Sequence, residues 1–342
     1  MPYSGINKHI TMLLQQIKDK YQRFKQWQQQ PVRYHMSDDV HHCNNCGLDF
    51  TGNYCPCCSQ KAEMGRINWQ SVHQGVMDVW GLGTRSLLYS VWQLLLRPGY
   101  FINDYISGKR QVSFPPVKML FIVTVIYSLV IYWFLPHVLG LNFAKIEEAN
   151  MVGYNQAMAP LLEWSRVNYS WSMLLMSVLA IIPTWLLFRE SPRNHHHSLP
   201  EGFFIQVLMS VLMVVVYFIL TPLGFMDYVT FLFISCGVMV FYYIVSYNRL
   251  FGYGIWGTLW RQVFVMIPVI YFLTALVFLL FDIDMSLLFP QSGAITPKQN
   301  VLMRMGAATA SMTCSLMVLA VGCIINYLVT MKARKQWRQQ NR

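Results

Sequence analysis

The sequence predicts an all-α polytopic membrane protein in which six transmembrane helices follow a small cysteine-rich head and interfacial helices. Three observations support this fold class: an unusually apolar composition, six long apolar runs, and an uneven distribution of Lys and Arg around them. Of 342 residues, 55% are hydrophobic and only 12% are charged, and the mean hydropathy is +0.35. Soluble domains carry about a quarter charged residues. Lipid is therefore the expected solvent for much of this chain.

The six apolar runs predict a transmembrane domain over residues 119–331. A helix of about 18–21 residues spans roughly 27–32 Å, which matches the hydrocarbon thickness of a bilayer. No run contains Lys, Arg, Asp, Glu or His. The runs cover residues 119–136, 171–188, 203–223, 228–247, 263–281 and 306–331.

The basic residues predict the orientation of these helices. With six crossings and a cytoplasmic N-terminus, the inner segments comprise the head, the loops 189–202 and 248–262, and a basic tail over 332–342. These segments hold 22 of the 26 Lys and Arg, and the outer loops hold 4. Cytoplasmic loops of membrane proteins are enriched in Lys and Arg, so both termini are expected in the cytoplasm.

Two amphipathic segments precede the transmembrane domain. Residues 1–30 place apolar side chains at three- and four-residue steps, which predicts a helix that lies on the membrane surface or packs against the head or a partner. Residues 67–118 are rich in aromatics and leucine, but Arg85, Arg97 and the Pro98-Gly99 pair interrupt them. An interfacial or re-entrant helical pair fits this second segment better than a membrane crossing.

Four cysteines predict a metal site in the head, over residues 31–66. Cys43-x2-Cys46 and Cys55-x2-Cys58 form two CxxC pairs, and four thiolates can close a tetrahedral shell around Zn²⁺. The start of the chain is polar and has no apolar signal core, so the cysteines are expected in the reducing cytoplasm, where metal binding is favoured over disulfides. We predict one structural zinc ion; an iron–sulfur cluster or a redox dithiol pair remains the alternative.

Two further patterns each have a functional and a structural interpretation. Bases and tyrosines alternate before the first apolar run, which is typical of a lipid headgroup site or of an ordinary basic membrane anchor. The residues concerned are Arg97, Tyr105, Lys109, Arg110 and Lys118. Small residues recur at four-residue spacing over 306–315, which suits a homo-oligomer interface or packing within the bundle. No catalytic constellation is apparent, and nucleic-acid binding is not expected.

The stretch from Cys43 to Lys118 resembles an uncharacterised bacterial family that pairs a short zinc-ribbon head with a multi-helix membrane region. The matching residues are Cys43-Asn44-Asn45-Cys46-Gly47, Phe50, Gly52, Tyr54-Cys55, Cys58, Gln60-Lys61, Arg66-Ile67, Leu96-Arg97-Pro98-Gly99, Tyr105, Gly108-Lys109-Arg110 and Pro116. Ser59 departs from the pattern, because a Gly usually follows the last cysteine; the change should loosen the turn but keep all four sulfurs. The resemblance implies the bacterial inner membrane and no established activity.

Two functional classes follow from these patterns. The first is a membrane-anchored scaffold or regulator that binds a protein partner through the cytoplasmic zinc ribbon. The second is a transporter or a protein that handles lipids, which rests on six helices, on Pro183 and Pro268 as residues that can kink their helices, and on the basic interfacial segment. The two prolines do not occupy matching positions of an inverted repeat. Membrane lipids are expected partners in either class, and an enzyme is less favoured because no catalytic residues stand out.

Overall fold

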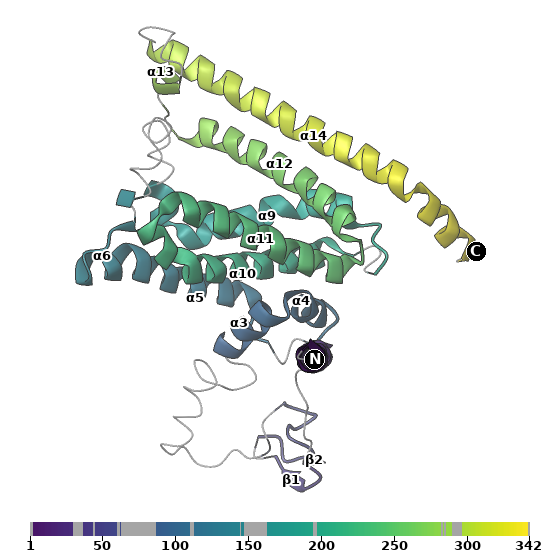
Figure 1. Cartoon of the computed structure of the whole chain (residues 1–342). Coiled ribbons are helices and arrows are strands. Elements are labelled where there is room, and N and C mark those ends of the chain that lie inside the picture. The colour runs from purple at the N-terminus through teal and green to yellow at the C-terminus, as the bar shows by residue number, and fades with distance from the viewer. Residues whose placement is uncertain are drawn as a thin grey trace. The chain divides into compact units, whose positions relative to one another are not determined.

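The computed structural model describes much of the chain in two compact units, Met1–Ser86 and Leu87–Arg342 (Figure 1). The residues described are 3–29, 37–43, 45–59, 62, 87–109, 113–143, 145–146, 163–193, 197–281, 283, 285–288 and 296–340. The predicted linker before the cysteines and the first part of the segment 67–118 lie largely outside them.

The first unit contains one long helix and one small hairpin. Helix α1 (Tyr3–Gln29) lies within the segment 1–30, and large apolar side chains along it, including Leu14, Ile17 and Tyr21, are exposed. Strands β1 (Val40–His42) and β2 (Asp49–Thr51) pair antiparallel, with His41 opposite Phe50. The first cysteine pair, Cys43 and Cys46, lies in the connection between these two strands.

The second unit is helical throughout its described elements. It begins with α3 (Leu87–Leu96) and α4 (Pro98–Ile106), which the Arg97-Pro98 step separates. The first spanning helix consists of α5 (Pro116–Ser128), the π-helical segment η2 (Leu129–Phe134) and α6 (Leu135–Val138). The remaining helices are α9 (Tyr169–Phe188), α10 (Leu199–Met226), α11 (Tyr228–Phe251), α12 (Ile255–Leu280), α13 (Met285–Leu288) and α14 (Pro297–Gln340).

Six of these helical stretches are long and apolar enough to cross a membrane, which confirms the predicted fold class. Each observed span includes all or nearly all of one predicted run, and most begin earlier or end later. The spans are Pro116–Val138, Tyr169–Phe188, Leu199–Met226, Tyr228–Phe251, Ile255–Leu280 and Pro297–Met331. Helix α14 also continues to Gln340, so most of the predicted tail is helical.

The predicted inner loop over 248–262 is wrong. Helix α11 ends at Phe251, and α12 begins at Ile255, so the connection is only residues 252–254. Gly252 ends α11 in the left-handed conformation, with φ 76°, which glycine adopts without steric cost. Arg249 and Arg261 are therefore helical, and Arg261 is buried. The apolar pattern missed this boundary because it treats every arginine as a loop residue.

Helix α10 is the most enclosed of the spans, and polar side chains tie it to its neighbours. The Nε2 atom of Gln206 donates to Thr184 Oγ1 of α9 at 2.8 Å and to the Tyr247 hydroxyl of α11 at 2.7 Å. All three residues are buried. Such bonds between helices compensate for the absence of water in hydrocarbon.

Helices α12 and α14 lie side by side as an antiparallel pair (Figure 1). Ser315 of α14 donates to the Pro268 carbonyl of α12 at 2.9 Å. Further along, Gly322 lies so close to Phe264 that an added Cβ would approach the ring within 2.8 Å. The region 306–315 thus contributes Ser315 to bundle packing, whereas Gly306 is exposed with open space around its Cα.

The polar contacts of α10 give a direct test of the packing. We expect Thr184→Val to destabilise the bundle by about 1 kcal/mol, because Gln206 loses a buried partner. Thr274→Val makes the same chemical change on α12, where the exposed hydroxyl bonds only its own helix, at the Ile270 carbonyl. This control should be nearly neutral. Thermal unfolding in detergent measures both, and equal effects would contradict the assignment.

Candidate metal centre

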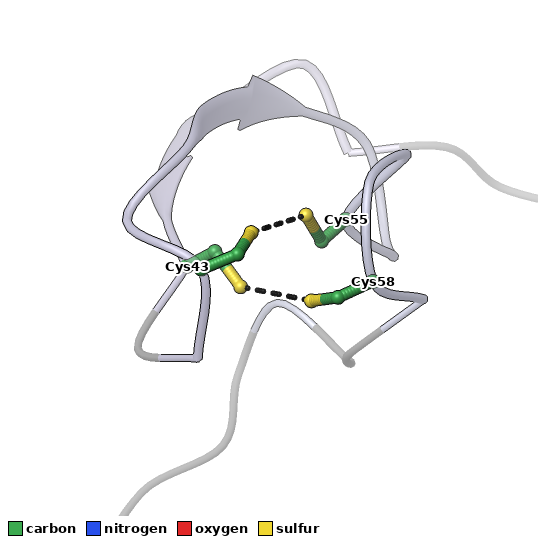
Figure 2. A group of neighbouring side chains, drawn as sticks. Cys43, Cys55 and Cys58 are labelled. Atoms are coloured by element: carbon green, nitrogen blue, oxygen red, sulfur yellow. Dashed lines mark hydrogen bonds between the residues drawn. The ribbon is translucent and has the colours of Figure 1, made fainter.

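The four predicted cysteines converge in the head. The Sγ atoms of Cys43, Cys46, Cys55 and Cys58 all lie within 4.8 Å of one another. The Sγ atoms of Cys43 and Cys58 are 3.4 Å apart (Figure 2). Those of Cys46 and Cys55 are 3.5 Å apart. This group is positioned to bind a metal ion, as the spacing predicted.

Local structure brings the two CxxC pairs together. Cys43 directly follows β1, and the turn after it is closed by Gly47 N–H donating to the Cys43 carbonyl at 2.9 Å. The Cys43 N–H in turn donates to the Leu48 carbonyl at 3.0 Å. In the second pair, Ser59 N–H donates to the Cys55 carbonyl at 2.9 Å. Two similar turns therefore face each other and present their sulfurs to one point.

The described residues of the head form only a small hydrophobic cluster. Cys43, Phe50 and Cys55 form its buried cluster, with Cys58 and Ala62 packed against it. A core of this size cannot offset the entropy of ordering the chain. The donor set fits a thiophilic ion such as Zn²⁺, which would be held by all four cysteines and would stabilise the fold by about 10–16 kcal/mol of apparent binding free energy.

The electrostatics of Cys46 predict proton release on metal binding. The Leu48 backbone amide lowers the pKa of the Cys46 thiol, whereas the Cys55 thiol, burial, and the Cys43 and Cys58 thiols raise it to about 12. A metal binds the thiolate, so the ion must displace these protons. Metal affinity should therefore fall as the pH is lowered.

The Ser59 position has a physical explanation. Its φ is 61°, in the left-handed region, as is that of Gly47 at 73° in the first turn. Glycine reaches this region freely, whereas a residue with a Cβ is disfavoured there. The expected Gly after the last cysteine is thus replaced by a residue that strains the turn while all four sulfurs stay in place.

The five predicted headgroup residues do not form one exposed cluster among the described residues. Arg97 is buried, and Tyr105 is buried with its ring 5.4 Å from that of Phe204. Lys109 and Lys118 are exposed. Arg110 lies outside the described residues.

Arg97 instead belongs to a polar network that the sequence did not reveal. Its guanidinium pairs with Asp104, which also accepts from Lys109 Nζ at 3.1 Å. Burial lowers the pKa of Arg97, and the Asp104 carboxylate opposes this shift. Asp104 lies seven residues after Arg97, close to two helical turns, and this spacing is the signal that could have paired them. Tyr100 lies beside both Arg97 and Arg249, 5.7 and 4.0 Å from ring centroid to guanidinium carbon.

Two segments match known families. Residues 85–128 match a family described as a protein of unknown function (DUF3667), which spans α3, α4 and α5. Residues 258–333 match NADH-ubiquinone/plastoquinone oxidoreductase, chain 3, which spans most of α12 and α14. No curated protein and no solved structure matches the chain. The first match and the cysteine cluster fit an uncharacterised family with a cysteine-rich head and several apolar helices.

A pair of matched cysteine variants tests the metal centre. Cys55→Ser removes a buried ligand, so we expect the purified protein to lose its bound metal. Cys57→Ser alters an exposed cysteine outside the four-sulfur group and should retain the full content of one ion per chain. Elemental analysis of both proteins measures the metal. Loss in both variants, or in neither, would contradict the assigned ligand set.

The strained turn gives an independent prediction. Ser59→Gly should stabilise the head by about 1 kcal/mol, because glycine adopts positive φ without steric cost. Resistance of the head to limited proteolysis in the full-length protein, at rising chelator concentration, measures the gain. Gly47→Ala is the reciprocal control and should lower the resistance. A neutral or destabilising Ser59→Gly would show that the left-handed turn does not limit the head.

Proposed function

We propose that this protein is an integral inner-membrane scaffold or regulator that binds a protein partner through its cytoplasmic zinc-binding head. In this proposal the metal is zinc, its role is structural, and both termini face the cytoplasm. A shell of four cysteines leaves no open coordination position for substrate or water. The metal is therefore structural in this proposal: it stabilises the fold of the head and takes no part in a reaction.

The observation that carries the proposal is the apolar surface of the head. Val40 is 73% exposed, Leu48 42% and Tyr54 53%, although the whole buried cluster of the head contains only a few residues. A small domain that exposes more large apolar side chains than it buries resembles one half of an interface. On the same hairpin, His42 Nδ1 and Asp49 Oδ1 lie 2.7 Å apart, so these two polar side chains contact each other beside the apolar surface.

A second candidate function is a transporter or a lipid-handling protein, and one observation favours it. A cavity of about 380 Å³ lies where the first spanning helix ends and α9 approaches. A volume of this size could hold a small ligand, and the neighbouring π-helical segment η2 is of a kind often found at functional sites. Its lining combines polar and apolar side chains: Tyr132, Pro136, His137, Asn142, Arg166 and Val167.

Helices α12 and α14 suggest where copies of the chain, or other membrane proteins, could associate. The matched segment is described as one numbered chain of an oxidoreductase, which supports a helical pair that packs against other chains. In this protein the exposed side of 306–315, which includes Gly306 and Ala310, offers a close-packing surface. Homo-oligomerisation through this face is part of the proposal.

The test compares proteins purified from native membranes in lipid particles. We expect a stoichiometric partner protein with the wild type and with Cys57→Ser. The partner should be lost when Val40, Leu48 and Tyr54 are all changed to Ser, while the metal content stays the same. A partner that survives this triple change would contradict docking through the head. A specific lipid or small molecule with no partner protein would favour the second candidate function.

A further inference from the structure

Arg261 is a buried cation in a spanning helix without a carboxylate partner among the described residues. Its side chain is 2% exposed, and the ion pairs of the described residues involve other groups. A charged side chain within a membrane helix is costly, so it is usually paired or functional. Arg97, the other buried arginine, does have a carboxylate, that of Asp104.

The contacts of Arg261 fix its guanidinium but leave donors unused. Its Nε donates to Asn326 Oδ1 of α14 at 3.0 Å, and its Nη1 donates to the Gly257 carbonyl at 2.7 Å. The guanidinium carbon lies over the rings of Tyr253 and Trp260, at 3.7 and 4.4 Å from their centroids. A guanidinium carries five N–H donors, so three remain, and Nη2 donates to no described group.

The start of α12 adds further donors on the same side of the chain. Gly254 caps the helix without a side-chain hydrogen bond, so the first backbone N–H groups of α12 lack helical acceptors. The positive end of the helix dipole favours an anion at this position. Thr258, in the next turn, is fully buried, and its hydroxyl has no partner among the described residues.

Neighbouring side chains suit a membrane surface. Arg193 Nη1 donates to the Arg249 carbonyl at 2.9 Å, and the Arg193 stem packs against Gly252, which places one more cation beside the 252–254 connection. Ile255 and Trp256 are 60% and 80% exposed at the end of the helix. Exposed Trp beside arginine is typical of the lipid headgroup region.

We propose that the N-terminal end of α12 binds a phosphate oxyanion, with Arg261 as its principal donor. Arginine is well suited to this ligand because its planar edge can donate two parallel bonds to phosphate oxygens. The phosphate can be the phosphodiester of a membrane lipid or free inorganic phosphate, and both present the same oxyanion. The Asn326 and aromatic contacts hold the guanidinium in place before the ligand arrives.

The first experiment titrates the full-length protein, in a neutral sugar detergent, with phosphatidylglycerol or with a galactolipid that lacks phosphate. Native mass spectrometry counts the bound lipids. We expect the wild type to prefer phosphatidylglycerol, and Arg261→Gln to weaken that binding about tenfold. Arg304→Gln removes an equal charge near the opposite end of α12, where Arg304 Nε donates to the Phe278 carbonyl at 3.2 Å, and should change the binding by no more than about twofold. Equal losses in the two variants, or no preference in the wild type, would overturn the proposal.

A second pair of variants keeps the test valid if Arg261→Gln does not fold. A Cβ at Gly257 would lie 3.3 Å from Arg261 Nη1, whereas a Cβ at Gly237, within α11, would meet nothing within 4 Å. Gly257→Ala should therefore shift the guanidinium and weaken phosphatidylglycerol binding several-fold, and Gly237→Ala should leave it unchanged. Unchanged binding in Gly257→Ala, with a folded protein, would overturn the role of Arg261.

Inorganic phosphate then distinguishes the two sources of the ligand. If phosphate at constant ionic strength raises the melting temperature of the wild type but not of Arg261→Gln, the site takes free phosphate. If phosphate has no such effect and the Arg261-dependent preference for phosphatidylglycerol holds, the ligand is the lipid phosphodiester. Absence of any Arg261-dependent effect with both ligands would overturn the proposal.

Discussion

The structure of the membrane domain depends on one constraint, which is that hydrocarbon offers no hydrogen bonds to polar groups. A buried hydroxyl or amide is therefore stabilised when it finds a partner on another helix or on its own backbone. Gln206 meets this demand with Thr184 and Tyr247, and so joins three helices at one point. Hydroxyl pairs do the same elsewhere, between Thr124 and Ser170 at 2.6 Å and between Ser177 and Ser210 at 2.8 Å. Apolar packing alone would define the relative rotation of the helices poorly. Lipid tails are as apolar as leucine, so a leucine side chain is about equally stable against lipid and against another helix.

The same constraint separates the two buried arginines by role. Arg97 lies against Asp104, so its charge is neutralised inside the protein and its contacts hold α4 together. Close packing of Gly99 on Arg249 fixes α4 against α11, since an added Cβ would come within 2.6 Å of the Arg249 stem. The guanidinium of Arg261 contacts an amide oxygen, a backbone carbonyl and two aromatic rings, and none of these groups carries a full negative charge. Arg97 therefore has a carboxylate that balances its charge, although its Nε is buried without a hydrogen-bond partner among the described residues. Arg261 has no carboxylate among the described residues, and its Nη2 is left for a ligand from outside the chain.

Sequence reasoning predicted what depends on composition and spacing, and missed what depends on contacts across the fold. Run length and charge were enough for six spans, and two CxxC spacings were enough for a four-sulfur group. They could not place Arg261 inside a helix, because its burial depends on Asn326, 65 residues later in the chain. The predicted headgroup residues show the same limit: the sequence pattern of bases and tyrosines is the same whether Arg97 faces lipid or pairs with the half-buried Asp104.

In the proposed function, a metal has the part in the head that polar pairs have in the membrane domain. Because the buried cluster among the described residues of the head is only Cys43, Phe50 and Cys55, a metal held by the four cysteines would couple folding of the head to occupancy of the site. The apolar face that includes Leu48 and Tyr54 is held in shape by the turns that present the sulfurs, since Leu48 accepts from Cys43 N–H and Tyr54 precedes Cys55. Anything that displaces the metal would therefore also dismantle this face. Binding of the metal would raise the affinity of the head for a partner that binds the folded face. By thermodynamic linkage, binding of that partner would raise the affinity of the head for the metal by the same factor.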